Sequence, residues 1–172
     1  DEVIIDEGIY REEIPLKVSG HPYVPEHLPV FRGVRGKTVA IRGSDVFQGP
    51  WESRDNGVFS APLPQSLFVA GAYNPYKLSA AIDEPGQVRP VGEKDGILPE
   101  TLGQLFVDGD FFFQVDSPAK LAPRCWLVSA DGRTLTANFG PTTPSEHLVE
   151  ITIRKRCFKP QFAGAVYIKV LN

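Results

Sequence analysis

The sequence predicts an all-β protein, and three observations lead to that fold class. The 172 residues include 16 Gly and 16 Pro spread along the whole chain, which leaves few windows where an uninterrupted helix could run. Several segments alternate apolar and polar residues with a period of two, which is typical of strands that bury one face. Asp131-Gly132 separates two segments rich in aromatic and β-branched residues, and Asp-Gly is a strong signal for a tight turn between antiparallel strands.

The first part of the chain carries short strand signals separated by turns. A β-branched run at 3–5 is followed by a turn at Gly8 and by an alternating run at 14–18. Residues 21–35 contain three prolines and are predicted to form a long loop. The run at 39–41 predicts another strand, which we expect to pair in parallel with, or lie beside, 3–5 or 166–168.

After residue 47 the strand segments become longer and more aromatic. They read GVFSAPL, QLFVDGDFFFQV, RCWLVSADGRTLTANF and HLVEITIRKRCF. Residues 75–100 are polar and rich in Gly and Pro, which is typical of a functional excursion, and 98–105 could start one helical turn. The end of the chain, AGAVYIKVLN, returns to a β-branched strand.

Charge and hydropathy argue against two classes of partner. Lys and Arg number 18 against 21 Asp and Glu, and a formal net charge of −3 provides no footprint for nucleic acid or an anionic membrane. No apolar run approaches the roughly 20 residues that a membrane-spanning helix needs. We therefore expect neither nucleic acid nor a membrane as a partner.

The first residues of the chain and its cysteines indicate how the protein was processed and whether its thiols are oxidised. The chain contains no Met and opens directly on an apolar strand, so we expect a processed protein or an excised fragment, compatible with a secreted or periplasmic parent. Cys125 and Cys157 lie in apolar, strand-like segments. The burial habit of unpaired cysteine favours two buried, reduced thiols, with a disulfide between them as the alternative.

The acidic residues offer no credible catalytic pair, although retaining glycoside hydrolysis needs two facing carboxylates. Glu12 and Glu13 are neighbours on a predicted strand and would point to opposite faces. Asp108 and Asp110 flank a glycine between two apolar runs, which is typical of a hairpin turn. Glu150 alternates with apolar positions and is expected on a solvated strand face. We therefore predict no catalytic residue in this chain.

Other site classes also lack support in the sequence. The three histidines have no Cys or acid at metal-ligand spacing, so structural or surface roles are favoured over a metal site. The serines lack a Gly-x-Ser-x-Gly motif, and no Gly-rich phosphate loop occurs. We expect neither a metal nor a cofactor.

A family resemblance refines the fold class. The opening VIIDEGIYREEI, with the later KTVAIRGSD, resembles the first rung of right-handed parallel β-helix proteins that act on carbohydrates. Four further segments resemble, in order, the β-sandwich that interrupts the helix in glycoside hydrolase family 120 β-xylosidases: LPQSLFVAGAYNPYK, LFVDGDFFFQV, RTLTANFGPTTPSEHLVEITIRKRCFKP and YIKV.

The resemblance implies a specific organisation. Residues 1–47 would form the first strands of a partial right-handed parallel β-helix, 48–159 an inserted Ig-like β-sandwich, and 160–172 a return to the helix. In that family the sandwich packs beside the active-site groove, and the catalytic carboxylates follow downstream of the insertion. The resemblance therefore implies that this chain alone is inactive. The sequence departs from the family after the NPY segment at 74–76, because no Trp follows it.

One group of residues could contact a carbohydrate. Aromatic faces stack on sugars, while amide and guanidinium groups hydrogen-bond their hydroxyls, and this combination occurs in Trp51, Tyr73, Asn74, Tyr76 and Arg89. The alternative is that these rings cover the seam between sandwich and helix.

Three functions remain open at this level. The chain could be part of a carbohydrate-active, glycoside hydrolase-like protein, with the sandwich forming a wall of the substrate groove. The alternatives are a non-catalytic glycan-binding module and a structural or interaction module of a β-helix protein. The expected partners are an oligo- or polysaccharide and the remainder of the parent chain.

Overall fold

The computed structural model describes residues 2–16, 29–68, 74–77, 101–160 and 169–171. These residues contain strands and three single 3-10 turns but no α-helix, which confirms the all-β prediction for this part of the chain. None of them belongs to a helix long and apolar enough to cross a membrane. The elements are β1 (Glu2–Ile5), β2 (Gly8–Tyr10), β3 (Ile14–Leu16), β4 (Val30–Gly33), β5 (Val39–Ile41), β6 (Ser44–Val46), β7 (Glu52–Ser53), β8 (Val58–Pro62), η2 (Gln65–Leu67), β9 (Leu105–Val107), β10 (Asp110–Gln114), η4 (Pro118–Lys120), β11 (Cys125–Val128), β12 (Thr134–Asn138), η5 (Pro144–Glu146), β13 (Val149–Thr152), β14 (Phe158–Pro160) and β15 (Lys169–Leu171).

The chain divides into two compact units. The first, here called the parallel unit, comprises Asp1–Gly43 and Arg154–Asn172, and the second, the sheet unit, comprises Ser44–Ile153. The sheet unit begins and ends a few residues earlier than the sandwich predicted over 48–159. Strand β6, which the sequence analysis assigned to the early strands, belongs to the large sheet.

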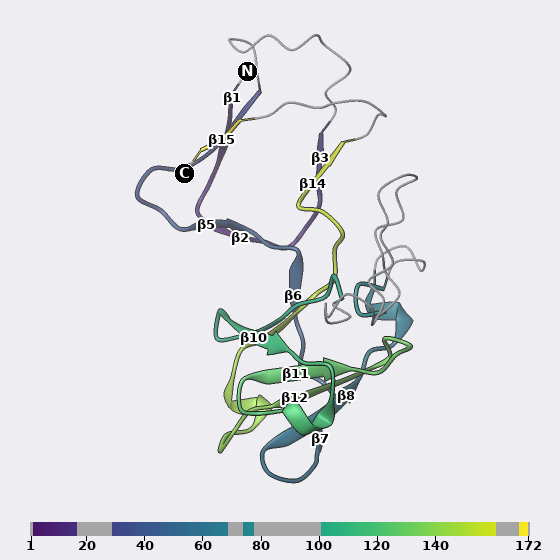
Figure 1. Ribbon diagram of the computed structural model, residues 1–172. Coiled ribbons are helices and arrows are strands. Elements are labelled where there is room, and N and C mark those ends of the chain that lie inside the picture. Colours follow the sequence, from purple (N-terminus) through teal and green to yellow (C-terminus); the bar gives the residue numbers. More distant parts are fainter. Residues whose placement is uncertain (1, 17–28, 69–73, 78–100, 161–168, 172) are drawn as a thin grey trace. The chain divides into compact units, whose positions relative to one another are not determined.

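All described strand pairs of the parallel unit are parallel. β4 lies between β1 and β15, β2 pairs with β5, and β3 pairs with β14. Figure 1 shows these three sets of strands on three sides of the unit. Parallel neighbours require a long crossover, and here each crossover passes through the strands of the other two sets.

The registers of the parallel unit repeat at a nearly constant spacing along the chain. Glu2 is the register partner of Val30, and Gly8 is the register partner of Val39. The pairs of β3 with β14 and of β4 with β15 are separated by a much longer stretch, because the whole of Ser44–Ile153 lies between their strands. When the sheet unit is left out of the count, these two separations become similar to the first two. The chain therefore returns to the same side at a regular interval.

One side-chain row shows how the parallel unit forms its core. Val3, Phe31 and Val170 are register partners on β1, β4 and β15. Phe31, on the middle strand, is buried and makes an edge-on ring contact with Phe158 at 5.3 Å between centroids, whereas the two valines on the outer strands are exposed. In this row the side chain on the middle strand is therefore the one that joins the core.

Two predictions for this unit are wrong in detail. Val39–Ile41 pairs in parallel, as expected, but its partner is Gly8–Tyr10 rather than 3–5; residues 166–168 lie outside the described part of the chain. Val30–Gly33 is a strand inside the segment predicted as a loop. Strand β4 begins directly after Pro29, and a proline just before a strand removes no ladder hydrogen bond from it.

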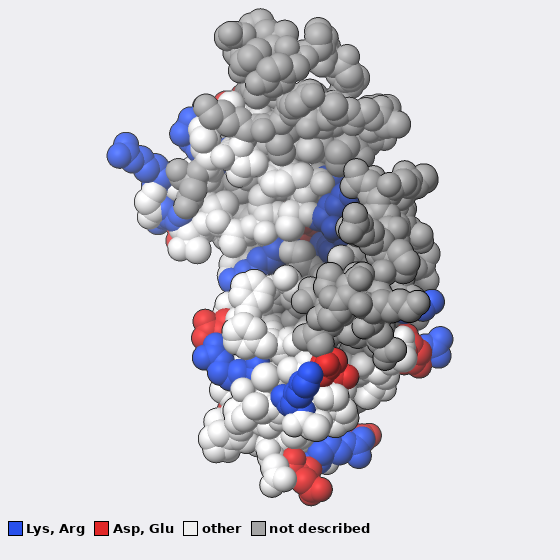
Figure 2. All heavy atoms as spheres, in the orientation of Figure 1, with Lys and Arg blue, Asp and Glu red and all other residues white. Residues whose placement is uncertain are grey.

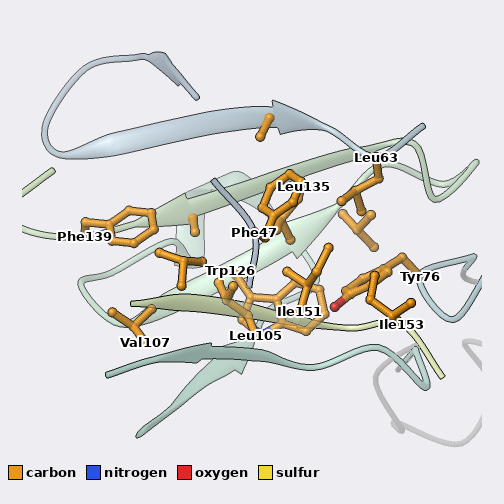
Figure 3. Close-up of a cluster of buried hydrophobic side chains, with 14 of the residues drawn as sticks. Phe47, Leu63, Tyr76, Leu105, Val107, Trp126, Leu135, Phe139, Ile151 and Ile153 are labelled. Carbon is orange, nitrogen blue, oxygen red and sulfur yellow. The ribbon is translucent and has the colours of Figure 1, made fainter. Parts of the chain in front are cut away.

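The sheet unit is one curled, eight-stranded sheet that wraps around a hydrophobic core. The strand order is β6-β13-β9-β10-β11-β12-β8-β7, and every pair is antiparallel except β10 and β11. The buried cluster, drawn in Figure 3, contains Phe47, Ala61, Leu63, Phe68, Tyr76, Leu105, Val107, Trp126, Val128, Leu135, Ala137, Phe139, Val149, Ile151 and Ile153. All of these residues belong to the sheet unit itself.

Both predicted hairpins of the sheet unit are present. Asp108 and Gly109 connect β9 to β10 with φ of 53° and 88°, the left-handed values that a tight two-residue turn requires. The β11–β12 connection is longer than the expected two residues, because it spans 129–133. Asp131 organises this loop, since its Oδ1 accepts hydrogen bonds from the Ser129 hydroxyl and the Arg133 backbone N–H.

The helical turn expected at 98–105 is wrong for its described residues. Residues 101–104 are irregular and 105–107 form β9, while 98–100 lie outside the described part of the chain. Thr101 fixes the irregular segment instead, because its backbone N–H and its hydroxyl both donate to the Gln114 side chain.

The two ends of the sheet unit leave it side by side. β6 and β13 are antiparallel neighbours, with Ser44 opposite Thr152. In the adjoining residues the Arg154 N–H donates to the Gly43 carbonyl at 2.9 Å. We call this paired segment the neck, defined by Gly43, Ser44, Thr152 and Arg154.

Candidate functional site

Tyr76 lies inside the core of the sheet unit. Its ring is 0% exposed and contacts Trp126 edge-on at 5.8 Å between centroids. The Tyr76 hydroxyl donates to the Gln104 carbonyl at 2.6 Å and accepts from the Thr152 N–H at 2.9 Å. This ring presents no face to solvent, and the hydroxyl joins the segment before β9 to β13.

Asn74 fixes the segment 74–77 to the β11–β12 loop. Its Oδ1 accepts from the Tyr76 N–H at 2.8 Å, and its Nδ2 donates to the Gly132 carbonyl at 3.0 Å. Gly132 lies so close that an added Cβ would stand 2.7 Å from the Lys77 nitrogen. Residues 74–77 therefore act as a brace between the β11–β12 loop and the β9–β13 pair.

Trp51 lies at the opposite end of the core. Its indole ring contacts Phe47 and Phe139 edge-on, at 5.5 and 5.4 Å between centroids. Figure 3 labels Phe139 and Tyr76 at opposite ends of the cluster. The structure therefore brings Asn74 and Tyr76 together but keeps Trp51 apart from them. Tyr73 and Arg89 lie outside the described residues.

Trp51 remains partly exposed, although its Nε1 is buried. This nitrogen has no hydrogen-bond partner within the described part of the chain, in contrast to Nε1 of Trp126, which donates to the Phe112 carbonyl at 2.9 Å. Of the two predicted aromatic contact residues that can be located, Trp51 is partly buried, whereas Tyr76 is fully buried.

Polar side chains gather next to Trp51 and Phe139. His147 stacks on Phe139, with 6.2 Å between ring centroids and 23° between planes. Its Nδ1 lies 2.6 Å from Asp108 Oδ2, and its Nε2 lies 2.8 Å from the Thr142 hydroxyl. We call Trp51, Asp108, Phe139, Thr142 and His147 the Phe139 end of the sheet unit.

The electrostatics of the Phe139 end centre on Asp108. Hydrogen bonds from the Leu148 N–H and from His147 hold the pKa of the Asp108 carboxyl below its usual value. The neighbouring Glu146 also has a lowered pKa, because the backbone N–H and the hydroxyl of Thr143 donate to it in a capping box. Both acids are thus held in their ionised form.

An Asp–His–Thr chain resembles the arrangement of a nucleophilic triad, but its hydrogen bonds argue against that chemistry. The Thr142 hydroxyl donates to the Phe139 carbonyl at 2.9 Å, so its hydrogen does not point to His147. The nearby N–H groups of Gly140 and Thr143 already donate to Asn138 and Glu146 side chains. Neither N–H is free to stabilise an oxyanion, as acyl transfer requires.

The predicted roles of two acidic groups need correction. Glu150 is 1% exposed, not on a solvated face, because Val149, Glu150 and Ile151 are all buried, and successive residues of a strand point to opposite faces. The Ser44 hydroxyl donates to Glu150 Oε1 at 3.3 Å. Glu12 and Glu13 precede β3 rather than belonging to it, and Glu13 forms an ion pair with Lys159 at 3.0 Å.

The cysteines are free, as predicted, but the expected complete burial is wrong. Cys125 and Cys157 are each half-buried. The Cys157 thiol contacts the Ile41 carbonyl at 3.7 Å. Within the described residues, no group of three or more His, Cys, Asp or Glu side chains is placed to hold a metal ion.

An exposed aromatic pair was missed in the sequence. Phe111 and Phe113 are 53% and 66% exposed on one face of β10, whereas Phe112 points to the other face and packs near Phe139 at 5.6 Å. The signal was present, because in FFFQ the first and third rings must share a face. Figure 2 shows Lys, Arg, Asp and Glu interspersed over the visible surface of the sheet unit, with no field of one sign.

Comparison with known proteins gives one structural likeness. No protein-family model matches the sequence, and no curated protein matches it significantly. The chain is similar to a solved structure described as the complex of XylC with xylose, with a TM-score of 0.69 and 25% sequence identity. The alignment covers 99% of this chain and 29% of that chain. The chain thus spans less than a third of the length of the protein it matches.

Proposed function

We propose that the chain is part of a carbohydrate-active β-helix protein, in which the sheet unit forms one wall of the substrate groove. The observation that carries this proposal is the likeness to the XylC structure, which was solved with xylose and aligns with nearly all of this chain. The sequence resemblance to family 120 β-xylosidases supports the same assignment independently of the coordinates.

The register of the parallel unit supports the finer fold assignment. Strands that return to the same three sides at a regular interval are what the rungs of a parallel β-helix require. In this interpretation β1–β3 form a first rung, β4, β5 and β14 a second, and β15 opens a third. The sheet unit then interrupts the second rung, and its one curled sheet stands where the resemblance places an Ig-like sandwich.

The catalytic carboxylates are assigned to residues outside this chain. Retaining and inverting glycosidases both need two facing carboxyl groups. Among the described residues, Asp108 is engaged with His147 and Leu148, and Glu150 is buried in a central strand. The remaining role for the sheet unit is to contact the sugar. Trp51 is the candidate contact residue within the described part of the chain, and Tyr73 and Arg89 remain candidates on the basis of the sequence.

A fluorescence titration tests sugar contact directly, because the chain has two tryptophans in different settings. We expect xylo-oligosaccharide to cause a saturable change in the emission of the purified chain. Trp51→Phe should abolish the change, whereas Trp126→Phe, the matched control in the core, should retain it. A panel of aryl glycosides should show no turnover. The absence of any binding by calorimetry would contradict the groove-wall role.

The alternative is a non-catalytic glycan-binding or structural module of a β-helix protein. Kinetics of the full-length parent separate the alternatives. If the sheet unit lines the groove, Trp51→Phe should raise KM with little change in kcat, because uniform binding is lost. If the unit is structural, neither constant should change while the fold is retained.

A further inference from the structure

Three hydrogen-bond contacts meet at His147 and Thr142. His147 Nδ1 contacts Asp108, His147 Nε2 contacts the Thr142 hydroxyl, and that hydroxyl contacts the Phe139 carbonyl. The carbonyl and an ionised Asp108 can only accept, and the hydroxyl has a single hydrogen. All three contacts are therefore hydrogen bonds at the same time only when each ring nitrogen carries a hydrogen. A neutral imidazole has one donor and one acceptor, so one of the three bonds must be given up.

We infer that Asp108, His147, Thr142 and the Phe139 carbonyl form a proton-dependent latch, which joins the β9–β10 turn to residues 139–148 and has all three of its hydrogen bonds only while the His147 ring is cationic. The two segments also share backbone contacts: the Leu148 N–H donates to Asp108 Oδ1, and the Asp108 N–H donates to the Leu148 carbonyl, each at 2.9 Å. The latch thus closes the end of the β9–β13 ladder.

Charged, aromatic and polar groups surround His147 in the described part of the chain. Asp108 approaches from the β9–β10 turn, and the ionised Glu146 precedes His147 on its own segment. The Phe139 ring lies against the imidazole plane, and an aromatic face attracts a cation. Thr142 presents an oxygen lone pair. Among the described residues the ion-pair partner of Asp108 is His147, so the carboxylate is available to the imidazolium.

Amide hydrogen exchange across about pH 5 to 8, the range in which imidazoles titrate, tests the latch on the full 172-residue chain. The readout is the protection of the Leu148 N–H, corrected for intrinsic exchange. We expect protection to fall roughly three- to tenfold as the pH rises, since one net hydrogen bond is lost. His147→Gln should remove the pH dependence, and Thr142→Val should reduce it, whereas Thr142→Ser should preserve it.

The control is the double variant His21→Gln, His27→Gln, which removes the other two histidines and should leave the effect unchanged. Leu148 protection that stays constant over this pH range in the unmodified chain would overturn the inference without any variant. A pH dependence that survives in His147→Gln would overturn it as well, because another group would then be responsible. Nitrogen NMR of the ring adds a second readout: in the state with high protection, both ring nitrogens must carry hydrogen.

Discussion

The hydroxyl of Tyr76 is a single group on which two segments depend. It accepts from the Thr152 N–H and donates to the Gln104 carbonyl, and the ring around it is fully buried. Tyr76→Phe should therefore lower the free energy of unfolding by about 0.5–1.5 kcal/mol for each hydrogen bond lost, since the Thr152 N–H and the Gln104 carbonyl keep each other as partners at 3.2 Å. Urea unfolding of the purified chain measures this change.

Tyr10 provides the control for this measurement. Its hydroxyl donates to the Asp6 carbonyl at 3.1 Å in an exposed setting, where water can replace the lost partner. Tyr10→Phe should change stability by no more than about 0.5 kcal/mol. Equal effects of the two substitutions would show that Tyr76 is not the brace described above.

The lowered pKa of Asp108 leads to a prediction for the stability of the protein at acidic pH. Because hydrogen bonds from Leu148 and His147 lower its pKa in the folded protein, ionised Asp108 stabilises the fold above its unfolded pKa of about 3.9. This contribution is lost as the pH falls through the lower, folded value. Asp108→Asn should flatten the loss of stability in acid while retaining the turn, since Asn tolerates positive φ.

The matched control is Asp110→Asn, on the other side of Gly109. Thermal unfolding from about pH 6 down to about pH 2 compares the two variants across the carboxyl range. The prediction is wrong if Asp108→Asn and the unmodified chain lose stability along the same curve.

At the scale of elements, two turn glycines separate backbone strain from close packing. Gly109 and Gly132 both have positive φ, 88° and 70°, but a Cβ on Gly109 would meet nothing within 4 Å. A Cβ on Gly132 would stand 2.7 Å from the Lys77 nitrogen. Gly109→Ala should cost about 1–2 kcal/mol for the left-handed conformation alone. Gly132→Ala should cost more, because residues 74–77 must also move.

Denaturant titration of both variants measures the difference. If the two substitutions lower the free energy of unfolding equally within error, residues 74–77 move without a measurable cost and contribute little to the stability of the sheet unit. A larger cost for Gly132→Ala, accompanied by changed fluorescence of Trp126 next to Tyr76, would localise the disturbance to the brace.

The hairpins could be predicted from the sequence, because their signals are local. The apolar, aromatic runs in 105–107 and 110–114 and the Asp-Gly pair between them specify both strands and their turn. The strand at Val30–Gly33 could not, because its partners are Glu2–Ile5 and Lys169–Leu171, far away in the sequence. Parallel pairing leaves no local signature, so register in the parallel unit is a property of the assembled fold.

The candidate site shows the same limit. Its residue types were identifiable, but Tyr76 and Trp51 occupy opposite ends of one core, which no spacing rule contains. Likewise, Glu150 alternates like a residue on a wet face, although both faces of β13 are buried at this position. The residues of the Phe139 end come from distant parts of the sequence and meet only in the folded protein.

At the scale of the whole molecule, the sheet unit is expected to fold by itself. Its hydrophobic cluster contains residues of 44–153 only, and its ends are paired in β6 and β13. A protein comprising residues 44–153 should unfold in a single cooperative transition, with a slope of about 1–2 kcal/mol/M in urea. Dispersed amide signals in NMR would accompany it.

The complementary protein, with residues 43 and 154 joined, is the comparison. Its outer strands expose Val3 and Val170, and unpaired strand edges promote association, so we expect it to aggregate or remain unfolded. The expectation for the sheet unit fails if 44–153 alone unfolds gradually, without a cooperative transition.

The geometry of the neck should allow another domain to be inserted in place of the sheet unit. Ser44 and Thr152 are register partners, so the two points of entry and exit stand about 5 Å apart, the spacing of one antiparallel pair. Any compact domain whose own termini are equally close could be exchanged for residues 44–153 without stretching the flanking strands. A fluorescent or ligand-sensing cassette placed there would report, through its own signal, whether the host strands on either side had assembled.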